Sequence, residues 1–242
     1  MRHLPKPQFD VEEIVKDCAQ SYRAEDKRKR FNNNAVYIKQ KSIEYDACAS
    51  QHDWLGITKE SIVNGEITPE EMAELYQNKF VKHASEREKY YDKIMSLAVS
   101  GKCPICGIGQ VSTLDHYLAK SLYPTYTVTP VNLIPVCKDC NFNKLDFELT
   151  SNCDALLHPY YDQIDDFIWL CAEIKKEEGS IVARYFVNPN IDNELYVRLK
   201  NHFEIYDLGQ AYAVQAATEI AENVLLWKNK YIELGKESLI AL

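Results

Sequence analysis

Apolar residues recur at helical spacing near both ends of the chain, which predicts helices there. Asp10 precedes the first repeat and is suited to be an N-cap, and acidic residues follow it in the first turn. The apolar positions of this first helix are Val11, Ile14, Val15 and Cys18. A second helix is predicted from about residue 24 into the forties, with these residues near its buried side: Phe31, Ala35, Ile38 and Ile43.

A third helix is predicted to begin at Thr68, because Thr68 is a good N-cap, Pro69 suits the first helical position, and two glutamates follow. One long helix should run from there to Gly101, which would serve as its C-cap. Its predicted apolar side consists of Met72, Leu75, Tyr76, Phe80, Tyr90, Ile94 and Leu97. His83 lies within this helix, and we expect it to face solvent rather than a metal.

The pattern changes to short elements between residues 101 and 150. Residues 110–116 and 133–136 are predicted to be strands, because they are short and rich in strand-forming residues. Residues 123–131 should form an irregular loop, and residues 139–147 a short helix. A module this small cannot fold on its own apolar core, so it needs another source of stability.

The C-terminal part combines a small β element with helices. Residues 164–187 are predicted to form two strands, and helices should span residues 193 to about 206 and 211 to about 234. The last helix has a strong apolar stripe of Val214, Ala217, Ile220, Ala221, Val224 and Leu225. Such a stripe usually faces a core, although it is also suited to bind a partner. His158, in an aromatic turn before this sheet, is expected to pack structurally, and a role in a site stays open.

These patterns together predict an α+β fold that is mainly α-helical. We expect an N-terminal helical region over residues 1–100, a small module over residues 101–150, and a C-terminal helical region with a β element over residues 151–242.

Composition narrows the functional classes. No apolar run approaches the length of a membrane span, and the start of the chain does not resemble a signal peptide, so a soluble, cytoplasmic protein with no membrane contact is expected. The chain lacks a glycine-rich Walker loop and is not expected to hydrolyse ATP by itself. Its net charge is −8, whereas proteins that hold nucleic acid unaided usually carry a basic excess. A nucleic-acid enzyme with this charge would need a local positive site or a partner.

Two Cys-x-x-Cys pairs carry the clearest chemical signal. One pair is Cys103 and Cys106, and the other is Cys137 and Cys140. Two such turns can supply four thiolates to one ion in the tetrahedral arrangement that zinc prefers. The alternative is four free buried thiols, but two pairs in so compact a segment favour a structural zinc. Such an ion would supply the stability that the small module lacks.

A second set of polar residues lies between and just after these pairs. Asp115 and His116 are adjacent, Asn132 follows, and Asn141 comes directly after the last cysteine. Carboxylate and amide oxygens suit Mg²⁺ or Mn²⁺, and a neutral imidazole can accept a proton near pH 7. Taken singly, these residues could be turn caps and ordinary packing groups. As an ordered set they indicate a second metal with a separate task.

This ordered set resembles the HNH, or ββα-metal, endonuclease family in the version that carries a zinc knuckle. The resemblance lies in the Cys-x-x-Cys, Asp-His, Asn-Leu-x-Pro and Cys-x-x-Cys-Asn-x-x-Lys pieces, which cover about 45 residues. It implies that Asp115 and Asn141 bind the catalytic Mg²⁺ or Mn²⁺ and that His116 is the general base. It also implies that Asn132 or a backbone carbonyl holds the imidazole and that Lys144 contacts a phosphate. The expected activity is hydrolysis of phosphodiester bonds, with DNA the favoured substrate and RNA the alternative.

The helical extensions and the phrases Leu-Asp-His-Tyr-Leu-Ala-Lys and His-Pro-Tyr-Tyr-Asp are similar to HNH effectors of bacterial anti-phage defence. Among these, the resemblance is strongest to the nuclease subunit of Septu-type and retron-associated systems. This resemblance implies an ATPase partner that binds the helical surface and controls access to nucleic acid. The alternative function is a catalytically silent zinc-knuckle module that binds nucleic acid or serves as an adaptor.

Overall fold

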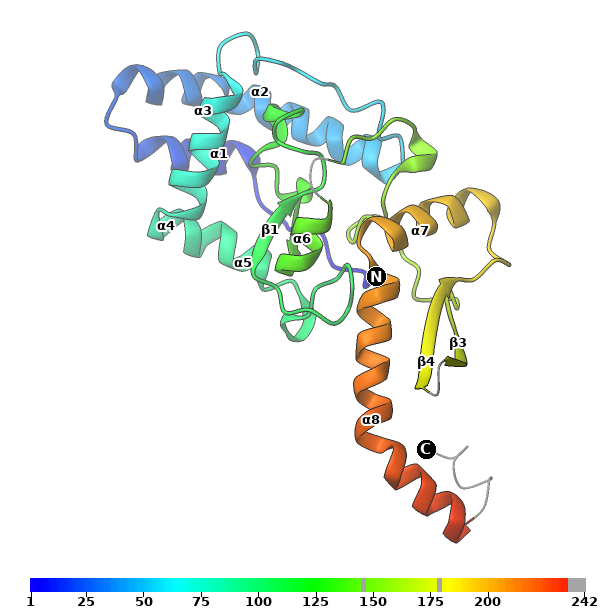
Figure 1. Cartoon of the computed structure of the whole chain (residues 1–242). Coiled ribbons are helices and arrows are strands. Elements are labelled where there is room, and N and C mark those ends of the chain that lie inside the picture. The colour runs from blue at the N-terminus through cyan, green and yellow to red at the C-terminus, as the bar shows by residue number, and fades with distance from the viewer. Residues whose placement is uncertain (145–146, 178–179, 235–242) are drawn as a thin grey trace.

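The computed structural model describes residues 1–144, 147–177 and 180–234, and it confirms the predicted fold class. Helices make up most of the regular structure, and two separate two-stranded antiparallel sheets complete it. The first sheet lies among the N-terminal helices, and the second lies beside the C-terminal ones (Figure 1). No helix in these described ranges is long and apolar enough to cross a membrane.

Helices α1 (Val11–Gln20) and α2 (Glu25–Ser50) form an antiparallel pair at the N-terminus. Asp10 caps α1 as predicted, because its carboxylate accepts the backbone N–H of Glu12 at 2.8 Å. All four predicted apolar positions of α1 are buried. The prediction for α2 is wrong at Ile43, which is 54 % exposed. Five residues after Ile38 the helix has turned by roughly 140° from that position, and the buried side continues through Ser42 and Tyr45 instead.

The predicted long third helix is broken into segments. They are α3 (Pro69–Glu74), a π-helical turn (Leu75–Val81), α4 (Ala84–Glu86), a second π-helical turn (Arg87–Tyr91) and α5 (Asp92–Met95). Thr68 and Glu71 form the capping box at its start.

The break lies at His83, whose backbone is extended, and it lets two aromatic residues of this region meet. The rings of Phe80 and Tyr90 stack with centroids 6.2 Å apart. Ten residues of straight helix would separate them by about 15 Å along the axis. Burying both rings in one core therefore requires the chain to bend. The half-exposed His83 side chain hydrogen-bonds to Glu86.

The central hairpin consists of β1 (Thr113–His116) and β2 (Leu133–Val136), and α6 (Lys138–Lys144) follows directly. In the antiparallel register Asp115 lies opposite Ile134, and His116 lies opposite Leu133. Strand β1 is shorter than predicted, because Gln110 pairs with Lys102 in an isolated bridge before the hairpin. The end of the predicted helix over residues 139–147 falls partly outside the described residues.

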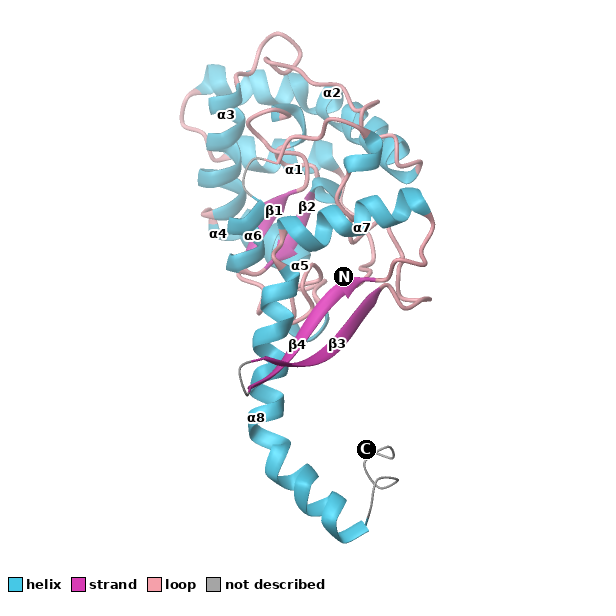
Figure 2. Cartoon of the chain, turned by 45° about the vertical axis from the view of Figure 1, so that its right-hand side comes forward, coloured by secondary structure: helices cyan, strands magenta, loops and turns pink. Residues whose placement is uncertain are grey.

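The C-terminal sheet consists of β3 (Leu170–Glu177) and β4 (Ser180–Val187), followed by α7 (Asn193–Ile205) and α8 (Leu208–Leu234). The first of these strands begins six residues later than predicted. Helix α8 packs along β4 and then extends well beyond the rest of the chain (Figures 1 and 2). Val214 is exposed near its start, and its outer part exposes the large apolar side chains Leu225, Leu226, Tyr231 and Ile232.

The three regions share core packing. One apolar cluster contains Tyr45 from the N-terminal region, Val136 from the hairpin and Tyr206 from the C-terminal region. His158 is fully buried beside it, and its ring stacks on Trp54 with centroids 5.5 Å apart. Burial lowers the pKa of His158 to about 3, so its ring is neutral at pH 7. These contacts give His158 a packing role.

A buried ion pair joins the aromatic turn to α7. Both terminal nitrogens of Arg198 donate to the carboxylate of Asp162 at 2.7 Å, and His52 and the backbone N–H of His158 contact the same group. Burial alone would raise the pKa of Asp162, but hydrogen bonds from His52 and Arg198 outweigh it and lower the pKa below its usual value.

Replacing Arg198 should destabilise the fold, because a buried carboxylate would lose its partner. We expect Arg198→Met to lower the free energy of unfolding at pH 7 by about 3–5 kcal/mol. The contribution of Asp162 is present above about pH 4 and is lost as pH falls through its lowered folded-state pKa. Urea unfolding between pH 7 and pH 3 measures both effects.

The matched control is Lys200→Met, which removes an exposed pair with Glu204 and should change stability by less than about 1 kcal/mol. Equal effects of the two substitutions would contradict a structural role for the buried pair.

Candidate active site and cysteine cluster

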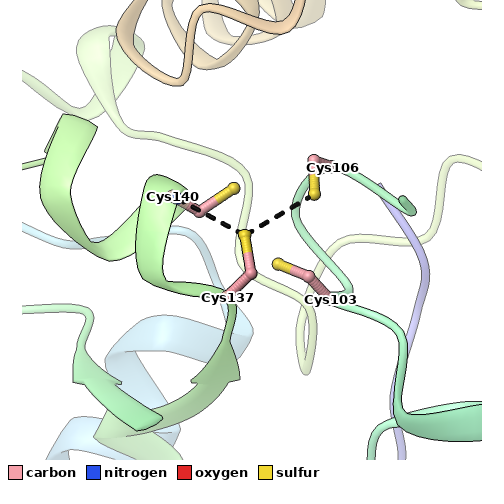
Figure 3. Close-up of side chains that lie close together, drawn as sticks. All are labelled: Cys103, Cys106, Cys137 and Cys140. Atoms are coloured by element: carbon pink, nitrogen blue, oxygen red, sulfur yellow. Dashed lines mark hydrogen bonds between the residues drawn. The ribbon is translucent and has the colours of Figure 1, made fainter. Parts of the chain in front are cut away.

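The four cysteines converge as their spacing predicted. All four side chains are buried, and their sulfur atoms lie within 4.8 Å of one another (Figure 3). The Sγ atoms of Cys106 and Cys137 are 3.9 Å apart. Tetrahedral zinc with Zn–S bonds of about 2.3 Å places its ligands about 3.8 Å from one another. The cluster therefore fits a structural zinc, and the described residues contain no other such group of cysteine, histidine and acidic side chains.

Tight backbone turns place these sulfurs. The first pair lies in a turn in which Gly107 has a φ of +76°, a conformation that favours glycine. Gly109 donates its N–H to the sulfur of Cys106 at 3.3 Å. A Cβ atom on Gly109 would lie 2.7 Å from the sulfur of Cys137, so only glycine fits there. The second pair spans the junction of β2 and α6, where the N–H of Cys140 points at the sulfur of Cys137.

The thiols influence one another's ionisation. Hydrogen bonds from the other cysteines, first Cys103, lower the pKa of Cys106, and those from Cys103 and Cys140 bring that of Cys137 to about 7 although Cys106 opposes them. Hydrogen bonds with the neighbouring cysteines raise the pKa values of the other two thiols. The largest contribution comes from Cys106 for Cys103 and from Cys103 for Cys140. Thiolate is the form of cysteine that binds metal.

A separate cavity of about 440 Å³ contains most of the predicted catalytic residues. It lies between the π-helical turn Leu75–Val81, strand β1 and helix α6. Asp115, His116, Asn141 and Lys144 all line it, whereas Asn132 does not. The short hairpin and the helix that follows it thus bring together residues from both ends of the module.

His116 is held in a defined orientation. Its Nε2 atom lies 2.8 Å from the backbone carbonyl of Thr127. A carbonyl can only accept, so Nε2 carries the proton and Nδ1 keeps the free lone pair. The ring also contacts the edge of Tyr76, with centroids 4.6 Å apart. Burial lowers the pKa of His116 to about 3, so the imidazole is neutral at pH 7.

Of the two groups expected to hold the imidazole, Asn132 or a backbone carbonyl, the structure shows the carbonyl of Thr127, and Asn132 hydrogen-bonds elsewhere. Its amide oxygen accepts the N–H of Leu118 at 2.8 Å and the hydroxyl of Tyr45, and its amide nitrogen donates to the carbonyls of Leu118 and Tyr126. Buried backbone groups of this loop need partners, and the fully buried Asn132 supplies them. It thereby fixes the segment that carries the Thr127 carbonyl, so its effect on His116 is indirect.

The prediction that Lys144 contacts phosphate is not what the geometry favours. Lys144 is 4 % exposed, and its ammonium donates to Asp115 at 2.8 Å and to the backbone carbonyl of His116. A buried ammonium requires such acceptors. Lys144 therefore joins α6 to β1. Burial raises the pKa of Asp115, and the charge of Lys144 opposes that shift.

Asp115 and Asn141 line the same cavity from β1 and α6. Asn141 is exposed, one turn before Lys144. A carboxylate and an amide are the donor types that suit Mg²⁺ or Mn²⁺. The donor types of the pair suit such an ion, although one oxygen of Asp115 already accepts from Lys144.

Sequence reasoning missed Lys120 as a site residue. This half-buried side chain lines the cavity, and its ammonium lies 5.3 Å from the centre of the Tyr76 ring. Within the described ranges, no carboxylate lies close enough to form an ion pair with it. The signal available in the sequence was that Lys120 follows His116 by only four residues. A short turn after the strand can therefore bring its side chain back to the same site.

The chain is similar to a phage protein over nearly its whole length. It is 26 % identical to Protein ea31 of Escherichia phage lambda over 246 aligned residues, which cover 97 % of this chain and 82 % of that protein. That name states no activity. No protein-family model matches the chain, and no solved structure matches it.

Removing one sulfur ligand should release the zinc and destabilise the module. We expect Cys137→Ser to reduce bound zinc from about one ion per chain to a small fraction and to lower stability by more than about 3 kcal/mol, because structural zinc contributes folding free energy. Elemental analysis after gel filtration and thermal unfolding measure the two effects.

Cys153→Ser is the control, because Cys153 is exposed and lies outside the cluster. Wild-type protein without zinc, or Cys137→Ser protein with full zinc, would contradict the assignment.

Proposed function

We propose that this chain is a metal-dependent endonuclease of the HNH type, which hydrolyses phosphodiester bonds in DNA or RNA. One observation carries the proposal. A single cavity collects a carboxylate, an amide and a neutral imidazole with a defined tautomer: Asp115, Asn141 and His116. This combination suits hydrolysis of a phosphodiester, and a purely structural knuckle does not need it.

The local architecture supports the same assignment. An antiparallel hairpin is followed directly by a short helix, in the order strand, strand, helix that the ββα-metal name describes. The base and one metal ligand lie on the first strand, and the second ligand lies on the helix. The cysteine cluster spans the base of this unit, where zinc would fix the helix to the preceding chain (Figure 3).

In the proposed mechanism His116 is the general base. Its Nδ1 atom accepts a proton from the attacking water, while the Thr127 carbonyl holds the ring through Nε2. Base catalysis of this kind contributes roughly 10²- to 10⁴-fold in rate. A divalent ion bound by Asp115 and Asn141 would supply electrostatic stabilisation of the scissile phosphate and the leaving oxygen. Lys144 and the buried loop around Asn132 position these groups.

We further propose that the enzyme acts in the cytoplasm with an ATPase partner, as an effector of bacterial anti-phage defence. The acidic chain supports a partner that supplies part of the grip on nucleic acid. The exposed apolar residues on the outer part of α8, including Leu225 and Ile232, offer a surface for it.

One observation favours the alternative of a catalytically silent zinc module that binds nucleic acid or a protein. Lys144 already neutralises Asp115, and the ammonium competes with a divalent ion for one carboxylate oxygen. A silent module would keep this ion pair when magnesium is added, whereas a nuclease would bind the metal.

The test is cleavage of plasmid DNA and of total RNA with Mg²⁺ or Mn²⁺, and then with EDTA. We expect wild-type protein to cut with metal and His116→Ala to cut at least about 100-fold more slowly, because the attacking water loses its base. His83→Ala is the matched control, since His83 lies outside the cavity and is half-exposed. Assays with and without the candidate ATPase identify a requirement for the partner.

Cleavage that persists in His116→Ala would contradict the assigned base. Wild-type protein that cuts neither polymer, even with the partner, would instead support the silent module.

A further inference from the structure

The charge of the cavity is opposite to that of the chain. The net charge of the whole chain is −8. Among the described residues, the charged side chains that line the cavity are Asp115, Lys120 and Lys144, whose formal charges sum to +1 with histidine counted as neutral. A cavity with an excess of positive charge in an acidic protein attracts anions toward it.

The two lysines of the cavity differ in whether their charge is paired with a carboxylate. Lys144 is committed to Asp115 and to the carbonyl of His116. Among the described residues, no carboxylate forms an ion pair with Lys120, whose ammonium lies over the Tyr76 ring. That ring limits where the ammonium can point without neutralising it. The positive charge of Lys120 therefore remains available to a ligand.

Lys120 also lies close to the reacting groups. Its ammonium lies 5.3 Å from the centre of the Tyr76 ring, and the centroid of that ring is 4.6 Å from the centroid of the His116 ring. Ser121, next in the chain, lines the same cavity. An anion bound by Lys120 would lie beside the imidazole that we propose as the base.

We infer that Lys120 forms a phosphate subsite that binds the phosphodiester backbone of the substrate without a divalent ion. This inference rests on the proposed function for its biological meaning, but the subsite is defined by charge and geometry alone. It transfers to Lys120 the phosphate contact that the sequence pattern suggested for Lys144. The ligand class is a phosphate diester, which both nucleic acids contain and free phosphate resembles.

The test measures binding rather than cleavage. Zinc-loaded full-length protein, in buffer without magnesium or manganese, is titrated into a fluorescein-labelled dinucleotide with one phosphodiester, and anisotropy is recorded. We expect Lys120→Ala to weaken binding at least about 10-fold, because a charge-assisted hydrogen bond is lost. Lys120→Arg should stay within about 3-fold of wild type. The slope of log affinity against log salt should fall by about 1 in Lys120→Ala.

Lys93→Ala is the matched control, because Lys93 is exposed on α5 and does not line the cavity. Inorganic phosphate should compete with the dinucleotide, and an uncharged nucleoside should not. Thermal unfolding checks that each variant is folded.

Two outcomes would overturn the subsite: Lys120→Ala binding as well as wild type, or wild type binding only after magnesium is added. The nuclease assignment stands or falls separately. If His116-dependent cleavage occurs but Lys120→Ala binds normally, the subsite is wrong and the nuclease stands. If binding depends on Lys120 but no cleavage occurs, the subsite stands and the nuclease is wrong.

Discussion

The position of α6 against β1 depends on four sulfur atoms that lie within 4.8 Å of one another. The hairpin and α6 contain too few residues to bury a core of their own, and the strands have only four residues each. Cys103 and Cys106 come from the segment after α5, and Cys137 and Cys140 bracket the start of α6. A zinc ion at this point would link the two segments covalently, with a binding free energy of about 10–16 kcal/mol in comparable sites. Because Asn141 directly follows Cys140, the link through the cysteines also fixes the position of Asn141.

A second link, between Lys144 and Asp115, acts at the other end of α6. It joins helix to strand inside the cavity, where burial makes an unpaired charge costly. Of the two lysines that line the cavity, the same pair leaves Lys120 without a carboxylate partner among the described residues. The arrangement explains how a chain with a net charge of −8 can present a positive site to a phosphate. It also sets the condition for metal binding, since an ion at Asp115 must compete with an ammonium.

The cysteine cluster and the fold class could be predicted from sequence because their signals are local. Two Cys-x-x-Cys pairs define their geometry within a few residues each, and helical periodicity marks most helices. The roles of Asn132 and Lys144 could not be predicted, because they depend on which buried groups lie opposite. Asn132 hydrogen-bonds to backbone carbonyl and N–H groups of the loop, and Lys144 forms an ion pair with Asp115. The broken third helix likewise depends on a tertiary contact, the stacking of Phe80 on Tyr90.

The central claim is that the module holds two metals with separate tasks. Anomalous diffraction from crystals of zinc-loaded protein grown with Mn²⁺ tests it most directly. The account predicts a zinc peak at the centre of the four sulfurs and a manganese peak between the side chains of Asp115 and Asn141. A zinc peak alone, with Lys144 still bound to Asp115 at saturating Mn²⁺, would contradict it.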